Sequence, residues 1–242
     1  MMELRIQNVV KNFGGIQALR NVNFAIRGTE LVGMIGPNGS GKTTLVNTIG
    51  GLYNPDGGKI EFNGRQINGL KPNQITRLGI GRTFQVTRAF RRMTVLENLL
   101  VPGEAVFPER GRKNLEKKAL EVLDFLNMSH LRHDYARNLS GGQRKLLELG
   151  QVLMAEPQLI FLDEPFARVH PKLMEVIMNT IAALHADGKS FLIISHDMTS
   201  MFSFVKRLLV LNYGDLIADG DPAVVRKDPQ VIEAYLGVEE DE

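Results

Sequence analysis

One eight-residue segment limits the possible folds of this chain more than any other feature. Residues 36–43 read GPNGSGKT, which fits the pattern G-x-x-x-x-G-K-[ST]. The apolar run Glu30–Ile35 precedes the segment, and the helical pattern Lys42–Gly51 follows it. A strand, a glycine-rich loop and a helix in this order form a phosphate-binding loop, because the loop amides and the positive helix end converge on an anion. A glycine-rich turn without a ligand is disfavoured, because all these features agree.

The residue types of this loop predict separate roles in nucleotide binding. Lys42 would reach the β- and γ-phosphates, while the hydroxyl of Thr43 would be a ligand of Mg²⁺. The predicted nucleotide-binding residues here are Gly36, Pro37, Asn38, Gly39, Ser40, Gly41, Lys42, Thr43 and Thr44.

A second feature is an apolar strand that ends on two carboxylates. The run Leu159–Leu162 is followed directly by Asp163 and Glu164. The carboxyl end of a parallel strand lies at the rim of the sheet, where ligands bind, so both side chains should lie beside the phosphate loop. Asp163 would hold Mg²⁺ and Glu164 would accept a proton from an attacking water. The alternative, a strand that simply ends in polar residues, is weaker when a phosphate loop is also present.

Composition and element order predict one α/β domain. The chain has 242 residues, 43% apolar and 23% charged, with a net charge of +2, which fits a globular domain rather than a disordered one. Without cysteine, thiolate metal sites and cysteine catalysis are excluded.

We expect no secretory signal, and the apolar runs are too short to cross a bilayer. Predicted strands are 4–10, 19–26, 30–35, 59–62, 81–85, 159–162, 190–194, 208–212 and 216–219; predicted helices are 42–51, 94–100, 113–126, 142–154 and 171–186.

Residues 139–143, LSGGQ, open a predicted helix shortly before the acidic pair, and this combination resembles the ATP-binding cassette (ABC) ATPase family. Ser140 suits a helix N-cap, so this is a second helix start able to bind phosphate. The resemblance implies a P-loop parallel-sheet core, an antiparallel β subdomain and an inserted helical subdomain. It divides the single domain 1–242 into a core, 1–85 and 157–242, and a helical subdomain at about 86–156. It also implies ATP hydrolysis with Mg²⁺ and a head-to-tail dimer that sandwiches ATP.

The resemblance assigns further site residues one by one. Phe13 matches the aromatic that stacks on adenine, although an ordinary core phenylalanine is the alternative. Gln85 matches the glutamine that senses Mg²⁺ and the γ-phosphate, and His196 matches the histidine that orients the water and Glu164. The signature residues that would contact the nucleotide of the opposite subunit are Ser140, Gly141, Gly142 and Gln143.

Two segments, 82–100 and 231–237, resemble the ATPases of branched-chain amino-acid importers. This implies a peripheral protein at the cytoplasmic face of the membrane, bound to integral-membrane permease subunits and a second ABC ATPase subunit, and indirectly to a substrate-binding protein. Cargo chemistry is not encoded in an ATPase subunit, so urea or amide import and lipopolysaccharide export remain alternatives. The second subunit is either another copy or a paralogue.

The arginines of the chain allow more than one interpretation. The arginines at 77, 82, 88, 91 and 92 suggest nucleic-acid binding, a solvated face or, as the resemblance implies, partner docking; the low net charge disfavours nucleic acid. Arg168 stands where the family tends to have glycine, so we predict that Arg168→Gly alters ATP-dependent dimerisation. The competing functions are a soluble ABC ATPase of translation or DNA repair, a non-hydrolysing regulatory module and a P-loop kinase.

Overall fold

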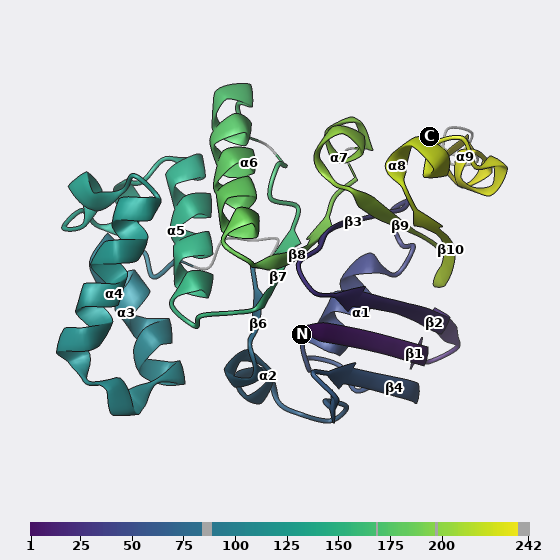
Figure 1. Cartoon of the computed structure of the whole chain (residues 1–242), viewed down its shortest axis with the longest axis horizontal. Helices are drawn as coiled ribbons and strands as arrows, with labels where there is room; N and C mark the ends of the chain where they lie inside the picture. Colours follow the sequence, from purple (N-terminus) through teal and green to yellow (C-terminus); the bar gives the residue numbers. More distant parts are fainter. Residues whose placement is uncertain (84–88, 168, 197, 237–242) are drawn as a thin grey trace.

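The computed structural model of the chain describes residues 1–83, 89–167, 169–196 and 198–236. Figure 1 shows an antiparallel sheet at one end, a central sheet crossing the middle, and a group of helices at the other end. The first sheet has the order β2-β1-β4-β5. Its strands are β1 (Glu3–Phe13), β2 (Ile16–Arg27), β4 (Gly57–Phe62) and β5 (Arg65–Gln66).

The central sheet is mainly parallel and has the order β10-β9-β3-β8-β7-β6. Its strands are β3 (Leu31–Ile35), β6 (Ile80–Arg82), β7 (Leu159–Asp163), β8 (Ser190–Ile194), β9 (Arg207–Asn212) and β10 (Asp215–Gly220). Every residue of β3, β7 and β8 is buried, as expected for parallel strands covered on both faces. Only β10 joins by antiparallel pairing, at the edge. The predicted α/β fold, with its additional antiparallel sheet, is confirmed.

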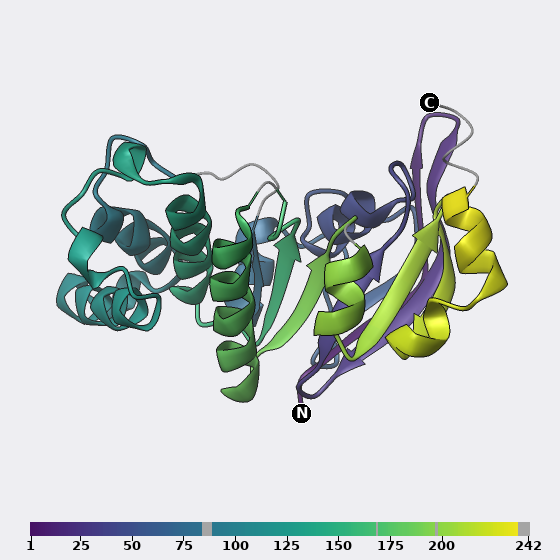
Figure 2. The ribbon, with the colours of Figure 1, turned by 90° about the horizontal axis from the view of Figure 1, so that it is seen from above.

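Helices cover both faces of the central sheet, as Figure 2 shows from above. They include α1 (Lys42–Ile49), α2 (Pro72–Leu78), α6 (Pro171–Ala186), α7 (Met198–Phe204), α8 (Pro222–Val225) and α9 (Pro229–Leu236). The sequence pattern predicted α1 and α6 but not the other four, because helices this short show little periodicity. The equally short α1 was predicted from the phosphate loop that precedes it. Across the described ranges, no helix combines the length and apolar character needed to span a bilayer.

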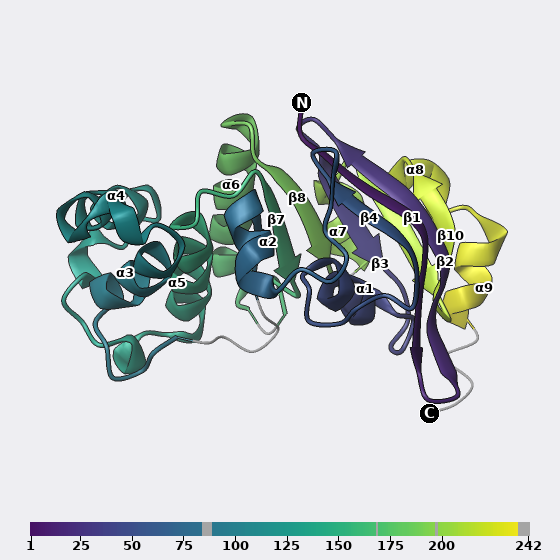
Figure 3. The same ribbon diagram turned by 90° about the horizontal axis from the view of Figure 1, so that it is seen from below.

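The remaining helices lie together at one end of the molecule, which Figure 3 shows from below. They are α3 (Val95–Val106), α4 (Arg112–Phe125) and α5 (Gly141–Leu153), with short 3₁₀ turns at 108–110, 129–131 and 136–138. The helix predicted for 94–100 extends further, through Pro102. A proline prevents the usual hydrogen bond to the carbonyl four residues earlier. Here that carbonyl, of Asn98, accepts one from Gln151 Nε2 at 3.3 Å instead, so packing against α5 tolerates the proline.

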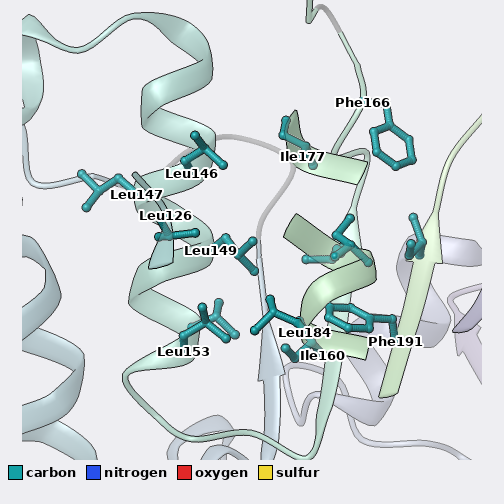
Figure 4. Packing of buried hydrophobic residues seen from close by; sticks show 14 of the residues in the cluster. Leu126, Leu146, Leu147, Leu149, Leu153, Ile160, Phe166, Ile177, Leu184 and Phe191 are labelled. Atoms are coloured by element: carbon teal, nitrogen blue, oxygen red, sulfur yellow. The ribbon is translucent and has the colours of Figure 1, made fainter. Parts of the chain in front are cut away.

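The buried apolar side chains form two clusters on opposite faces of the central sheet. Neighbouring residues of β7 belong to different clusters: Ile160 lies in the first and Phe161 in the second. Figure 4 shows the first cluster, in which Leu149 and Leu153 of α5 and Leu184 of α6 lie close to Ile160. This packing attaches α5 to the central sheet.

The strand order sets the position of the site. Strands β3, β8 and β7 are adjacent and parallel, so their carboxyl ends lie at one edge of the sheet. That edge is the usual ligand-binding side of an open α/β sheet. The phosphate loop follows β3, Asp163 ends β7 with Glu164 directly after it, and Ser195 follows β8. Segments more than one hundred residues apart in sequence therefore meet there.

Candidate active site

The phosphate loop connects β3 to α1 in a conformation that requires glycine at two positions. Gly41 has a φ of +106°, and a β-carbon there would lie 2.6 Å from the carbonyl oxygen of Ala18. At Gly36 a β-carbon would overlap the Leu211 carbonyl. Side chains at these positions would be strained and would push the loop away from the neighbouring backbone. The glycines of the motif therefore set the loop geometry before any ligand binds.

Lys42 lies inside the curve of this loop. Its side chain is buried, and Nζ donates hydrogen bonds to the carbonyl oxygens of Gly36 at 2.7 Å and Pro37 at 2.8 Å. It also contacts Ser40 Oγ at 3.2 Å. Burial lowers the pKa of Lys42, and the nearby Glu164 and Asp163 oppose that shift. A buried cation close to its loop amides provides a strong binding point for phosphate.

The loop and both carboxylates line one cavity of about 190 Å³. Its walls are Ala18, Asn38, Gly39, Ser40, Gly41, Lys42, Thr43, Thr44, Asp163, Glu164 and Ile194. Most of the phosphate-loop residues predicted from sequence are therefore brought together with the predicted acidic pair. Gly36 and Pro37 shape the loop through their carbonyls and are not part of this wall.

Asp163 is almost completely buried at the end of β7. Its backbone N–H donates to Thr83 Oγ1 at 3.2 Å, and its Oδ2 lies 3.5 Å from a guanidinium nitrogen of Arg82. In the described part of the chain, Oδ2 accepts no hydrogen bond of normal geometry, and the Arg82 contact is an ion pair. Burial raises the pKa of Asp163, while Arg82 opposes this. A buried carboxylate oxygen without a donor, in one cavity with the Thr43 hydroxyl, fits the oxygen ligands that Mg²⁺ prefers.

Arg82 corrects one expectation from the sequence. We grouped it with arginines of a solvated face or a docking surface, but its side chain is only 12% exposed and contacts both Asp163 and Asn47. A charged residue at the end of a short strand has no local pattern that indicates its direction, so only the fold reveals this contact.

Glu164 and His196 lie in direct contact. Glu164 Oε1 accepts a hydrogen bond from the His196 backbone N–H at 3.0 Å and lies 2.9 Å from its Nδ1. Ser195 Oγ donates to Oε2 at 3.4 Å. Glu164 also has a positive φ of +52°, a strained conformation for a residue other than glycine and one often found at functional sites. The structure therefore holds the Glu164 carboxylate in a defined position at the wall of the phosphate cavity.

The signature segment, residues 139–143, lies outside the phosphate cavity. Ser140 caps α5, because its Oγ accepts from the Gln143 N–H at 3.2 Å while Gln143 Oε1 accepts from the Ser140 N–H at 2.8 Å. Gly141 is exposed, with nothing but the tip of Arg144 near the position of a β-carbon, whereas a β-carbon at Gly142 would overlap Leu173 of α6. None of these signature residues lines the phosphate cavity. The two predicted phosphate-binding helix starts are thus separate within one chain.

Phe13 lies at the end of β1 and is 42% exposed, so it is not an ordinary core residue. The Tyr53 ring meets it edge-on with centroids 5.1 Å apart, and Lys11 Nζ lies 5.4 Å from its centroid. Lys11 in turn pairs with Asp56 at 3.0 Å. An exposed, supported aromatic ring could stack on a base.

The predicted sites at Gln85 and Arg168 lie outside the described residues.

Comparisons with known proteins identify the family and the fold. Residues 19–167 match the ABC transporter family, and residues 216–241 match a family described as branched-chain amino acid ATP-binding cassette transporter. A probable branched-chain amino acid transport ATP-binding protein, LivG of Archaeoglobus fulgidus, is 39% identical over all of this chain and 98% of its own length. The ADP conformation of MJ1267, an ATP-binding cassette of an ABC transporter, superposes with a TM-score of 0.89 at 38% identity, covering 98% of this chain and 99% of that one. A dimeric post-hydrolysis structure of the cassette MJ0796 bound to ADP and Pi gives a TM-score of 0.80 at 30% identity, covering 90% and 98%.

Proposed function

The chain belongs to the ABC transporter family of ATP-binding cassettes, and on that premise we propose that it hydrolyses ATP to power import of branched-chain or other hydrophobic amino acids. The observation that carries the proposal is the single cavity that joins the phosphate loop to Asp163 and Glu164. The full-length similarity to LivG and the match at residues 216–241 support the amino-acid cargo. They favour it over urea or amide import and lipopolysaccharide export.

ATP binding would use the loop amides, Lys42 and the positive end of α1 for the phosphates. Phe13 would stack on the adenine ring. Mg²⁺ would be held by Thr43 and Asp163, with Gln85 as a further contact, and would neutralise charge on the phosphates. Asp163 can serve as a ligand of Mg²⁺ because its buried Oδ2 accepts no hydrogen bond in the part of the chain described.

Hydrolysis would be carried by Glu164. Its carboxylate, beside the phosphate cavity, would take a proton from water as the water oxygen attacks the γ-phosphorus. The bond from that phosphorus to the β–γ bridging oxygen breaks, and ADP leaves with the bonding electrons. His196 would orient Glu164 through the 2.9 Å contact and would face the γ-phosphate. Phosphoryl transfer depends mainly on such placement and charge neutralisation.

The functional unit would be a head-to-tail dimer with membrane partners. The signature residues 140–143 do not line the phosphate cavity of their own chain, so we infer that they contact the ATP of a second cassette. The dimeric MJ0796 structure supports this arrangement. Integral-membrane permease subunits and, indirectly, a substrate-binding protein would complete an importer, with this chain peripheral at the cytoplasmic face. The core, 1–85 and 157–242, would bind nucleotide, and the helical subdomain, at about 86–156, would carry the signature.

The test of the mechanism is the variant Glu164→Gln. We expect it to bind ATP, to form a stable dimer with Mg-ATP in light scattering, and to lose turnover by about 100-fold or more, the usual contribution of a general base. Glu121→Gln, at an exposed position on α4, is the matched control and should keep normal turnover. Rapid hydrolysis by Glu164→Gln would refute the assigned role.

The cargo is tested separately in cells. A strain that lacks this chain should lose uptake of labelled leucine, and the wild-type chain but not Glu164→Gln should restore it. Normal leucine uptake together with lost urea uptake would replace the proposed cargo while leaving the ATPase mechanism intact.

A further inference from the structure

The loop that carries Glu164 needs a fixed support. Glu164 has a left-handed backbone, φ +52°, which is energetically unfavourable for an L-residue. The backbone N–H of Glu164 bonds to the Ile194 carbonyl at 2.9 Å, which ties the loop to β8. The carbonyls of Glu164, Pro165 and Ala167 converge on one nitrogen from another element.

That nitrogen is Nζ of Lys145. It donates to the carbonyl oxygens of Glu164, Pro165 and Ala167, each at 2.9 Å. An ammonium has three N–H donors, so this loop uses all of them. Within the described residues, no carboxylate forms an ion pair with Lys145, which leaves the charge committed to backbone oxygens.

Lys145 lies in a partly buried position. The residue is half-buried beside a cavity of only about 30 Å³, and burial lowers its pKa while Glu148 and Glu164 oppose the shift. Truncation would leave the three carbonyl oxygens without the donor that they share and would release the loop from α5.

Lys145 is also part of the signature helix. It lies on α5 shortly after its cap, Ser140, and α5 is packed against α6 and β7, as Figure 4 shows. One side chain therefore joins the helix that begins at the signature to the loop that carries the hydrolytic carboxylate.

We propose that Lys145 is a positioning residue, which fixes the Glu164 carboxylate for water activation and makes its loop move together with the signature helix. The proposal rests on the proposed hydrolytic role of Glu164. Lys145 touches neither nucleotide nor water in this scheme. It acts through the backbone of residues 164–167.

The first experiment compares Lys145→Met with the wild type. We expect kcat at saturating ATP to fall by about 10- to 100-fold, the effect of misplacing a reacting group by about 1 Å, with nucleotide affinity nearly unchanged. Lys145→Arg should recover part of the loss, because the planar guanidinium keeps the charge but cannot donate to three carbonyls from a single nitrogen. Val122→Ala, at a buried position of α4, controls for general loss of stability and should keep kcat.

The second experiment uses Glu164→Gln as background. If Lys145 acts through Glu164, adding Lys145→Met should change the residual single-turnover rate by no more than about twofold. Losses that multiply, a wild-type kcat in Lys145→Met, or an equal loss in Val122→Ala would each overturn the inference. Normal turnover in Glu164→Gln would instead defeat the proposed function, so the two failures are distinguishable.

Discussion

The phosphate loop before α1 and the segment 139–143 before α5 are both glycine-rich helix starts, but only the first is enclosed by its own chain. The phosphate loop surrounds a buried lysine and shares a cavity with two carboxylates from β7. The α5 start is closed on itself by a capping box, and Gly141 there faces open space.

This difference suggests separate roles for the phosphate loop and the start of α5. A helix start with its own cation and carboxylates can bind phosphate and assist its chemistry within one chain. The α5 start has an open face, and the cation beside it, Arg144, donates to the Leu139 carbonyl instead of lying in a cavity with carboxylates. Such a helix start would complete a site only when another molecule brings the phosphate to it. On the proposed function, the phosphate loop and the α5 start of one cassette would therefore belong to two different ATP sites. The following variants test that division, beginning with the largest expected effect.

Gly141→Glu should separate binding from turnover. The position is open, so the isolated chain should fold and bind nucleotide normally. In the dimer the added carboxylate would face the partner's γ-phosphate, and we expect turnover to fall by about 100-fold, as when one transition-state donor is lost. ATPase assays and nucleotide titration measure both effects, with Asn114→Glu on exposed α4 as the control. Normal turnover would mean that the α5 start does not contact ATP.

Lys42→Ala should have the opposite effect: the isolated chain should lose affinity for nucleotide. Removing the buried ammonium takes away a charge-assisted contact to phosphate, a loss of about 2 kcal/mol or more, or about 30-fold in affinity. Fluorescent nucleotide titration of the monomer provides the measurement. Unchanged affinity would show that the loop amides alone hold the phosphates.

Gly142→Ala should act on stability rather than on chemistry. Its β-carbon would overlap the Leu173 side chain, so that side chain or the two helices must shift, and we expect a loss of about 1–3 kcal/mol in unfolding free energy, typical of overpacking. Gly141→Ala, one residue away in open space, is the control and should be as stable as the wild type or more so. Denaturant unfolding distinguishes them. Equal stability of the two variants would contradict the packing role of Gly142.

Asp163→Asn should slightly stabilise the nucleotide-free protein at neutral pH. Burial raises the pKa of Asp163 in the folded state, so the folded protein binds this proton more tightly than the unfolded chain does. Stability is therefore lost as pH rises from the unfolded pKa of about 3.9 through the folded pKa. The melting temperature of the variant should exceed that of the wild type at pH 7, and the difference should shrink towards pH 4. A lower melting temperature at pH 7 would show that the Arg82 contact outweighs burial.

Local sequence was enough for the parts of the site that are contiguous. The phosphate loop, the strand that ends in Asp163 and Glu164, and the Ser140 cap each combine a special residue with a periodic neighbour. Element boundaries were less predictable. The extent of α3 through Pro102 depends on a hydrogen bond from Gln151 of another helix, and the short α2 had only its Pro72 start and its Gly79 end as signals.

The sequence by itself determined the phosphate loop and the acidic pair that line one cavity, because backbone conformation and hydrophobic period are properties of neighbouring residues. The tertiary structure alone decided that Arg82 turns inward to Asp163, that Gly142 is small because of Leu173, and that Lys145 holds the Glu164 loop. These contacts join positions far apart in the chain, and the direction of a long side chain depends on which partners the packing of helices and strands brings within its reach.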